Sequence, residues 1–174
     1  MTRGAGEGRT VATEASVCLV AIGETDLPLL EQLVRSYYVE DGHTFHDDRQ
    51  LPALAALAAL AADEPFGRAW LVRLDERPVG YAVLTWAFSV EAGGREACLD
   101  ELYLVPEVRN RGLGRRVLAL LEAEARAQGV RRVFLEVERH NRVIGLYRRA
   151  GYADHDRFLM SKFLDREGAS DSAA

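Results

Sequence analysis

The sequence has few of the residues that build disulfide-linked or metal-stabilised proteins. Only two of its 174 residues are cysteines, and Cys18 and Cys98 both lie in apolar stretches typical of β-strands. We expect two buried free thiols in a reducing compartment rather than a disulfide or a catalytic thiol. The four histidines are scattered, and neither a His-Glu-x-x-His nor a paired-cysteine pattern occurs, so we expect no metal site.

Long apolar runs and an excess of basic charge are also missing. The longest apolar run, residues 51–62, is shorter than the ~20 residues that cross a bilayer. The N-terminal segment has no apolar core flanked by basic residues. We therefore expect no membrane association and a cytoplasmic location. A net charge of −5 also argues against a nucleic-acid partner.

One stretch, residues 102–116, combines glycines with cations. Pro106 ends a run of β-formers, and Gly112 and Gly114 introduce apolar residues at helical spacing, which predicts a strand, a tight turn and a helix. The first turn of a helix has N–H groups without partners, and its dipole favours negative charge. The stretch therefore predicts a site for a phosphate-bearing ligand. Four cations surround this turn: Arg109, Arg111, Arg115 and Arg116.

Two motifs in this sequence resemble those of a known family. The pattern Arg-x-x-Gly-x-Gly at Arg109, Gly112 and Gly114 looks like the acetyl-CoA-binding turn of the Gcn5-related N-acetyltransferases (GNAT). A P-loop would need a lysine after the second glycine, and a Rossmann fingerprint would need a third glycine where Val117 stands. Residues 146–152, Leu-Tyr-Arg-Arg-Ala-Gly-Tyr, are similar to the family's Leu-Tyr-x-x-x-Gly-Phe segment.

The pattern of elements also resembles the acyl-CoA N-acyltransferase (GNAT) fold, an α/β fold with a mixed central sheet flanked by helices in three layers. We expect the order β-α-α-β-β-β-α-β-α-β in one domain at 16–163, between a disordered tail at 1–15 and a polar tail at 164–174. The two strands joined at residues 75–77 are expected to form an antiparallel hairpin, and the strands flanking the central helix a parallel pair. The expected strands are 17–22, 69–74, 78–88, 97–105, 133–137 and 158–163, and the expected helices follow Thr25 or Asp26, Asp47 or Asp48, Gly112, and His140.

The resemblance implies where acetyl-CoA, the cosubstrate, is bound. Backbone N–H groups between Arg109 and Arg115 would bind its pyrophosphate, and a bulged strand before the turn would hold the pantetheine arm in a gap. A backbone N–H near Leu104 would polarise the thioester carbonyl. The family places an asparagine seven residues before its tyrosine; here His140 has that position and Asn141 is one residue nearer, so either could serve. The cofactor-binding candidates are Leu102, Leu104, Val105, Arg109, Asn110, Arg111, Gly112, Leu113, Gly114, Arg115 and Asn141.

Catalytic candidates follow from the same resemblance and from strand geometry. Tyr147 matches the family tyrosine that protonates the leaving thiolate, which suits a phenol with an ordinary pKa of about 10. For the general base we rank Glu101 first, then Asp100, then Glu136. Consecutive strand residues point to opposite faces, so Asp100 and Glu101 share the acceptor pocket only if a bulge intervenes. Glu136 lies in an apolar strand of a parallel pair, where a carboxylate must be paired or functional.

The resemblance implies an acetyl-CoA-dependent N-acetyltransferase in which an amine attacks the donor directly within a ternary complex. Residues 37–48, which we expect to form a loop, carry four acids and favour a small amine or polycation as acceptor. Protein N-termini or lysines are alternative acceptors, and a non-catalytic acyl-CoA sensor is the alternative from another class. A homodimer is possible, because such sheets often pair at an exposed edge.

Overall fold

The computed structural model describes residues 15–40, 47–61 and 65–162. Apart from residue 15, the tails expected at 1–15 and 164–174 lie outside these ranges. The strands are β1 (Val17–Ala21), β2 (Gly67–Leu74), β3 (Arg77–Ser89), β4 (Gly94–Leu104) and β5 (Arg132–Leu135). The helices are α1 (Leu27–Glu40), α2 (Asp47–Ala61), α3 (Leu113–Ala127) and α4 (Ile144–Arg149), with short 3-10 turns η1 (Glu24–Asp26) and η2 (Pro106–Val108).

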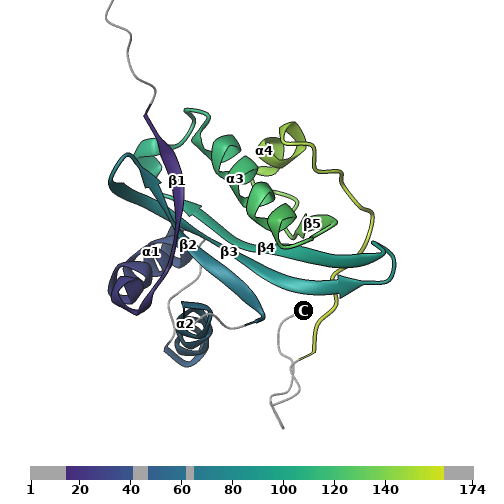
Figure 1. Cartoon of the computed structure of the whole chain (residues 1–174), viewed down its shortest axis with the longest axis horizontal. Coiled ribbons are helices and arrows are strands. Elements are labelled where there is room, and N and C mark those ends of the chain that lie inside the picture. The colour runs from purple at the N-terminus through teal and green to yellow at the C-terminus, as the bar shows by residue number, and fades with distance from the viewer. Residues whose placement is uncertain (1–14, 41–46, 62–64, 163–174) are drawn as a thin grey trace, which may run out of the picture.

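The five strands form one mixed sheet in the order β1-β2-β3-β4-β5 (Figure 1). The pairs from β1 to β4 are antiparallel, which confirms the hairpin between β2 and β3. β4 and β5 are parallel, as expected for strands joined by a crossover helix. The expected mixed sheet with flanking helices is therefore confirmed.

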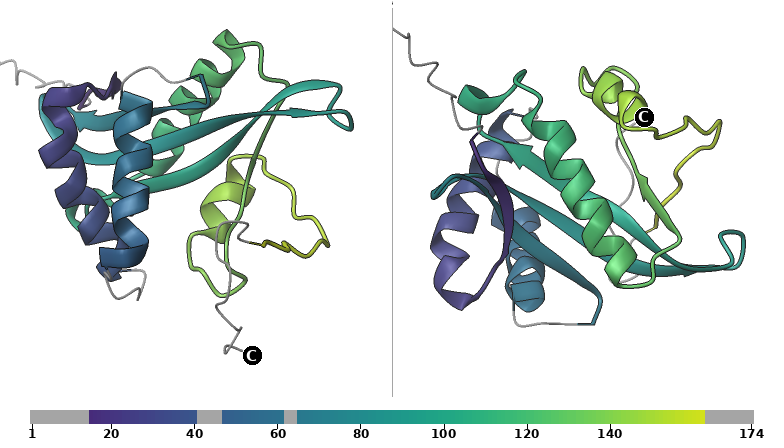
Figure 2. Two further views of the ribbon diagram at one scale, coloured as in Figure 1. Left: turned by 90° about the horizontal axis from the view of Figure 1, so that it is seen from below. Right: turned by 45° about the horizontal axis from the view of Figure 1, so that its top comes forward.

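Helices cover both faces of the sheet, giving three layers (Figures 1 and 2). α1 and α2 lie on one face, where Leu30, Val34 and Leu57 pack against Leu71 and Tyr81 of the strands. α3 and α4 lie on the other, where buried residues of α3 pack against β2, β3 and β4. The sheet thus separates two cores, and consecutive residues of the central strands, 69–72 and 79–84, are buried because both faces of the sheet are covered. The buried residues of α3 are Leu113, Val117, Leu118, Leu121 and Ala125.

A β-bulge in β4 is the local feature that shapes the middle of the sheet. Val83 of β3 pairs with Glu101 and the next residue, Leu84, pairs with Leu99, so Asp100 is the extra residue. The inserted residue changes which side chains of β4 face α1 and α2. The pairing of β4 with β5 stops at the same place, at the Leu99–Leu135 pair, while β4 continues to Leu104. The sheet therefore opens between β4 and β5 just after the bulge.

Several expectations from the sequence need correction. α1 continues through Tyr37 to Glu40, so the loop predicted at 37–48 begins later; residues 41–46 lie outside the described ranges. Residues 153–162 form no strand, although 158–163 has a strand pattern, because they have no ladder partner within the described chain. β5 ends at Leu135, which leaves Glu136 exposed beyond it rather than central in a buried strand.

Two further expectations are wrong in detail. α4 begins at Ile144 rather than at Asn141, because residues 138–143 form turns first. Cys18 is an exposed thiol rather than a buried one. It lies on the edge strand β1, where its neighbours Val17 and Leu19 pack against the core beneath α3 and Cys18 belongs to neither core. Cys98 is partly buried, and burial raises the pKa of its thiol to about 11.

Candidate active site

The glycine turn between β4 and α3 forms a cradle of backbone donors. Asn110 and Gly112 both have a positive φ, 59° and 79° respectively. Where residues of left-handed and right-handed backbone conformation alternate, successive N–H groups point to the same side of the chain. The first bond inside α3 runs from the N–H of Arg116 to the carbonyl of Gly112. For the N–H groups of residues 110–115, no acceptor is present among the described residues. Six donors at the N-terminus of a helix fit a pyrophosphate.

Arg109 was expected to bind the pyrophosphate, but its backbone N–H and its guanidinium both bind groups of the protein. Its backbone N–H donates to the carbonyl of Pro106, and its guanidinium makes a bidentate ion pair with Glu40 of α1, with Nη2 2.8 Å from Oε2. Its Nε donates to the carbonyl of Leu104 at 2.6 Å, and the guanidinium lies 5.3 Å from the ring centre of Tyr103. Arg109 thus ties the end of α1 to the end of β4. We therefore remove its N–H from the expected pyrophosphate donors.

The last residues of β4 present backbone groups to the opening beside β5. The N–H of Val105 donates to Val79 of β3 at 2.8 Å, so it points toward β3. Adjacent residues of a strand direct their N–H groups to opposite sides, which points the N–H of Leu104 toward the opening. The side chains of Leu102, Leu104 and Val105 pack against the core beneath α3. Gly114 lies close to Leu104 and to α4, since a Cβ there would be 4.0 Å from Leu104 and 3.1 Å from Leu146.

Glu101 is a partly buried carboxyl on the face covered by α1. The hydroxyl of Tyr38 donates to its Oε1 at 3.3 Å, while its Oε2 is buried and has no hydrogen-bond partner among the described residues. Burial raises the pKa of the Glu101 carboxyl, and the neighbouring charge of Asp100 adds to this, whereas the hydroxyls of Tyr81 and Tyr38 partly offset it. Asp100 itself is exposed, because it is the inserted residue of the bulge.

A cluster of four tyrosines, two of which interact with this carboxyl, was not expected from the sequence. The rings of Tyr37, Tyr38, Tyr81 and Tyr103 lie edge to face or tilted, with centroids 5.5 to 6.5 Å apart. Burial, followed by the charge of Glu101, raises the pKa of Tyr38 to about 12. The adjacent pair Tyr37-Tyr38 was a visible signal, but its place beside Glu101 depends on how α1 packs on β3 and β4.

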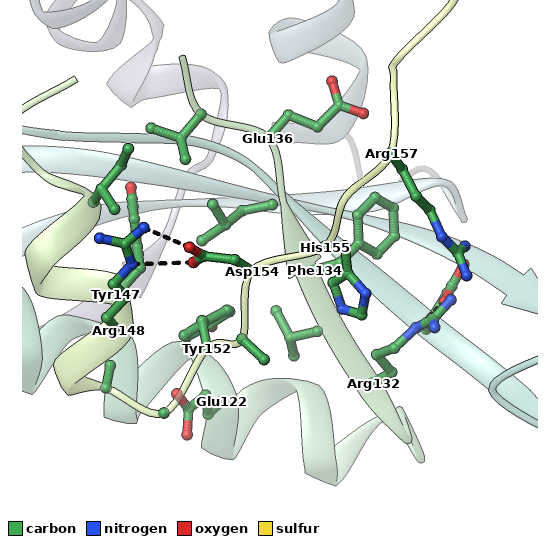
Figure 3. A pocket seen from close by; sticks show the side chains of 18 of the residues that line it. Glu122, Arg132, Phe134, Glu136, Tyr147, Arg148, Tyr152, Asp154, His155 and Arg157 are labelled. Carbon is green, nitrogen blue, oxygen red and sulfur yellow. Dashed lines mark hydrogen bonds and ion pairs between the residues drawn. The ribbon is translucent and has the colours of Figure 1, made fainter. Parts of the chain in front are cut away.

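Tyr147 lies on α4, on the face of the sheet opposite to Glu101. It packs against the core beneath α3, and its ring makes an edge contact with Tyr152 at 5.9 Å. Burial raises the pKa of the Tyr147 phenol, which keeps it protonated at neutral pH. Tyr147 also lines the hollow beside β5 shown in Figure 3.

The residues before α4 are held by local contacts. The side chain of Asn141 accepts a hydrogen bond from the N–H of Val143 at 3.0 Å, and its backbone N–H donates to Glu138. His140 is exposed and contacts Glu138, with Nε2 3.0 Å from Oε2. Asn141 therefore shapes the turn that leads into α4. Of the two candidates, only Asn141 is partly withdrawn from solvent.

No cluster of three or more potential metal ligands occurs among the residues that the structure describes. Within the same ranges, no helix has the length and apolar character needed to span a membrane.

The fold and the site together define an acyltransferase-like domain, with a sheet split between β4 and β5 and a donor cradle at the start of α3. Comparison with known proteins gives the family: the model of the acetyltransferase (GNAT) family matches residues 27–152. The chain therefore belongs to the GNAT acetyltransferase family, as the two motifs predicted.

Individual relatives agree with this assignment. The chain is 33% identical over 86 residues to an IAA acetyltransferase of Azospirillum brasilense, a match that covers 49% of this chain and 56% of that protein. The chain spans about half the length of the curated relatives it matches. The solved structure of the integron cassette protein HFX_CASS3, from a salt-marsh metagenome, is 31% identical with a TM-score of 0.72, covering 86% of this chain and 91% of that one.

The fold is also that of a predicted acetyltransferase from Clostridium acetobutylicum, solved with acetyl-CoA. That structure has a TM-score of 0.70 at 17% identity, and the match covers 87% of this chain and 99% of that one. At this identity, the likeness concerns the fold alone.

Proposed function

We propose that this protein is an acetyl-CoA-dependent N-acetyltransferase that moves an acetyl group to a primary amine by direct attack within a ternary complex. One observation carries the proposal: β4 and β5 separate after the Leu99–Leu135 pair, and the turn that follows β4 has N–H groups, at residues 110–115, for which the described chain provides no acceptor. A backbone cradle next to a slot suits a ligand with a pyrophosphate at one end and a long narrow arm.

The chain's own groups have distinct roles in this proposal. The N–H groups of residues 110–115, without Arg109, bind the pyrophosphate, and Leu102, Leu104 and Val105 line the pantetheine arm. Acetyl-CoA supplies a thioester carbonyl that an amine can attack. The N–H of Leu104 faces the opening and stabilises the oxyanion that develops there, as preorganised backbone donors do. Asn141 contributes to the cofactor side through the turn before α4.

Proton transfer is assigned to Glu101 and Tyr147. Glu101 accepts the proton of the amine, and burial suits it to this role because its raised pKa brings it nearer to neutral pH. Tyr147 donates its phenolic proton to the departing thiolate. Asp100, exposed at the bulge, tunes the pKa of Glu101 by its charge. Glu136 is removed from the candidates, since it is exposed beyond the end of β5.

The acceptor is proposed to be a small amine or a polycation. Glu101 and Asp100 provide negative charge on the face covered by α1, whereas Glu40, another expected acceptor-side acid, is bound by Arg109. Of the other three expected acids, Asp41 and the side chains of Asp47 and Asp48 lie outside the described part of the chain. We place the reaction in the cytoplasm.

The experiment is thiol release from acetyl-CoA across a panel of amines, with Tyr147→Phe as the control. The panel includes polyamines, amino acids, short peptides and aminoglycosides, the last because an aminoglycoside N-acetyltransferase shares this fold. An acceptor that the wild type acetylates and Tyr147→Phe does not would support both the reaction and the acid. Calorimetric binding of acetyl-CoA with no turnover on any amine would instead favour a non-catalytic sensor.

A further inference from the structure

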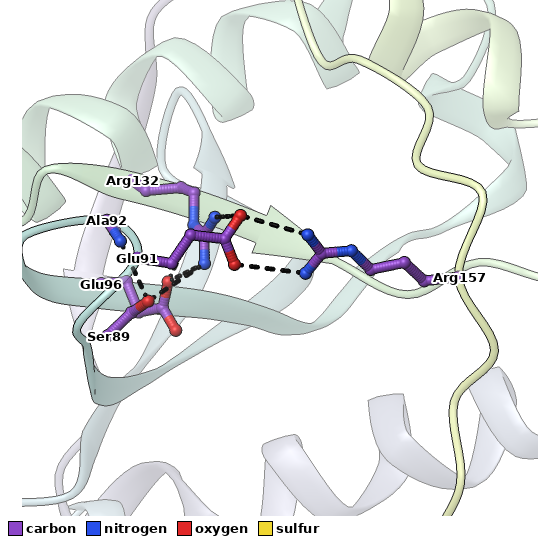
Figure 4. A network of polar contacts seen from close by, with 6 residues as sticks. All are labelled: Ser89, Glu91, Ala92, Glu96, Arg132 and Arg157. Atoms are coloured by element: carbon purple, nitrogen blue, oxygen red, sulfur yellow. Dashed lines mark hydrogen bonds and ion pairs between the residues drawn. The ribbon is translucent and has the colours of Figure 1, made fainter.

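β4 carries two acids that are at least partly buried, and their partners differ. Glu96 is 8% exposed, and Arg132 of β5 binds its carboxylate, with Nε 2.8 Å from Oε2. Arg132 also contacts Ser89 and Glu91 of the β3–β4 hairpin (Figure 4). Glu96 therefore has a cation as its partner, as buried acids usually do. Glu101 differs, because no cation of the described chain forms an ion pair with it.

Tyr81 of β3 lies on the same face of the sheet as Glu101. It pairs with Tyr103 of β4, two residues beyond Glu101, so Tyr81 and Glu101 are diagonal neighbours across the two strands. Residues two apart on a strand share a face, and diagonal neighbours are within reach of long side chains. The side chain of Tyr81 is 0% exposed and belongs to the core beneath α1 and α2. Its phenol therefore ends inside this core, beside the carboxyl.

Two buried polar atoms lie at this place without hydrogen bonds. The hydroxyl oxygen of Tyr81 and Oε2 of Glu101 are both buried, and neither has a hydrogen-bond partner among the described residues. An unpaired buried donor or acceptor costs free energy, and here one group offers a donor and the other an acceptor. The last torsion of a glutamate side chain is soft, so the carboxyl can turn toward the hydroxyl at little cost.

The surroundings of Glu101 agree with a contact between these two groups. Burial raises the pKa of the Glu101 carboxyl, and the hydroxyl of Tyr81 opposes this more than that of Tyr38 does. β2 and α2 contribute apolar side chains to this core. The titratable groups of the described chain around the pair are Tyr37 and Tyr38 of α1 and Asp100 and Tyr103 of β4, with Arg109 and its partner Glu40 beyond Tyr103.

We propose that Tyr81 is a positioning residue for the base: its hydroxyl donates to Oε2 of ionised Glu101 and leaves Oε1 to accept the proton of the amine. The inference rests on the proposed role of Glu101. Tyr38 occupies one lone pair of Oε1, at 3.3 Å, and the second lone pair remains for that proton. Burial, followed by the charge of Glu101, raises the pKa of the Tyr81 phenol, so Tyr81 keeps its own proton and acts as a donor.

The first test compares the pH dependence of kcat/KM in the wild type and in Tyr81→Phe, which keeps the ring and removes the hydroxyl. A hydrogen bond to a charged carboxylate lowers its pKa by about one unit or more. We expect the acidic limb of Tyr81→Phe to lie about one pH unit above that of the wild type, so that the rate on this limb falls about tenfold. An acidic limb that stays in place overturns the proposal.

Tyr103→Phe is the matched control for this test. It removes the hydroxyl of another buried tyrosine, from the position on β4 directly opposite Tyr81. The Tyr103 hydroxyl does not contribute to the pKa of Glu101. We therefore expect the acidic limb of Tyr103→Phe to coincide with that of the wild type. An equal shift in both variants would reflect loosened packing of the cluster and would also overturn the proposal.

The second test needs no turnover. Wild type, Tyr81→Phe, Glu101→Gln and the double variant are melted at pH 4 and pH 8. Without the hydroxyl the folded carboxyl holds its proton to still higher pH, so Tyr81→Phe loses more stability than the wild type as pH rises through the folded pKa. We expect the difference in Tm between Tyr81→Phe and the wild type to be more negative at pH 8 than at pH 4 by about 2–4 °C. With Glu101→Gln present, Tyr81→Phe should change Tm equally at both pH values.

Together the tests separate this inference from the proposed function. A loss of Tm that grows with pH, together with no turnover on any amine, supports the hydrogen bond of Tyr81 to Glu101 and rejects the proposed reaction. Turnover with an unshifted acidic limb supports the reaction and overturns the positioning role. A change in Tm that is equal at both pH values shows that the Tyr81 hydroxyl does not bind the ionised carboxyl, which overturns the proposal.

Discussion

Replacing Glu101 by glutamine should abolish most of the activity and, at the same time, stabilise the fold. Glutamine keeps the shape of the side chain and can still accept the hydrogen bond of Tyr38. It cannot accept the proton of the amine, and a general base contributes about 10²–10⁴-fold to the rate. We therefore expect kcat to fall by about this factor. Because burial raises the pKa of Glu101, the acidic limb of the wild-type profile lies above the usual range of a glutamate.

The stability effect follows from the same pKa. The folded carboxyl holds its proton to higher pH than the unfolded one, so the free energy of unfolding falls as pH rises through the folded pKa. Below the unfolded value of about 4.3 both states are protonated and this loss disappears. Once the carboxyl is ionised, the wild type buries a charged Oε2 that has no hydrogen-bond partner among the described residues, which costs about 1 kcal/mol or more. Glutamine should then raise Tm by about 2–4 °C at pH 8.

The assay combines initial rates across pH with thermal melts at pH 4 and pH 8. Asp100→Asn is the matched control, since it removes the same charge from the exposed neighbour. It should keep most of the rate and move the acidic limb to lower pH, because the charge of Asp100 raises the pKa of Glu101. An acidic limb that survives in Glu101→Gln, with a rate near that of the wild type, would refute the assignment of the base.

Three further changes test other parts of the site and the fold. Tyr147→Phe should lower kcat by about 10²-fold or more and leave KM for acetyl-CoA unchanged, since only the proton donor is lost. A KM that rises while kcat stays the same would contradict an acid role. Gly112→Ala should weaken acetyl-CoA binding about tenfold in calorimetry, because its φ of 79° positions the donors. Gly93→Ala, at a φ of 70° on the β3–β4 hairpin, should lower the stability by a similar amount but leave acetyl-CoA binding unchanged. If it weakens acetyl-CoA binding as much as Gly112→Ala does, the glycine turn is not the pyrophosphate site. Leu84→Ala should cost about 2–5 kcal/mol in urea unfolding, against at most about 0.5 kcal/mol for exposed Val90→Ala.

Local patterns in the sequence determined most of the secondary structure. The apolar spacing of Leu113, Val117 and Leu121 predicted α3, and Gly129, with a φ of 73°, ends it as a C-terminal glycine does. The hairpin between β2 and β3 was likewise predicted, and α2 begins at Asp47, one of the two starts, Asp47 or Asp48, that the sequence offered. The glycine turn and the motif around Tyr147 also led to the family. Each of these features depends on residues that are close together in the sequence, within one helix, one turn or one pair of adjacent strands.

Tertiary structure alone decided what those elements do together. The pair of Arg109 and Glu40 joins residues 69 positions apart, and no local pattern indicated that α1 would withdraw this arginine from the turn. The bulge at Asp100 sets which carboxyl is buried, and it is defined by pairing with β3. Residues 158–162 have a strand pattern, yet a strand needs a partner edge, and the described chain provides none at that place. Backbone hydrogen bonds in a sheet join residues that are far apart in the sequence, and periodicity within one segment does not show whether a partner strand is present. For this reason the periodicity predicted a strand at 158–163 that the described chain does not form.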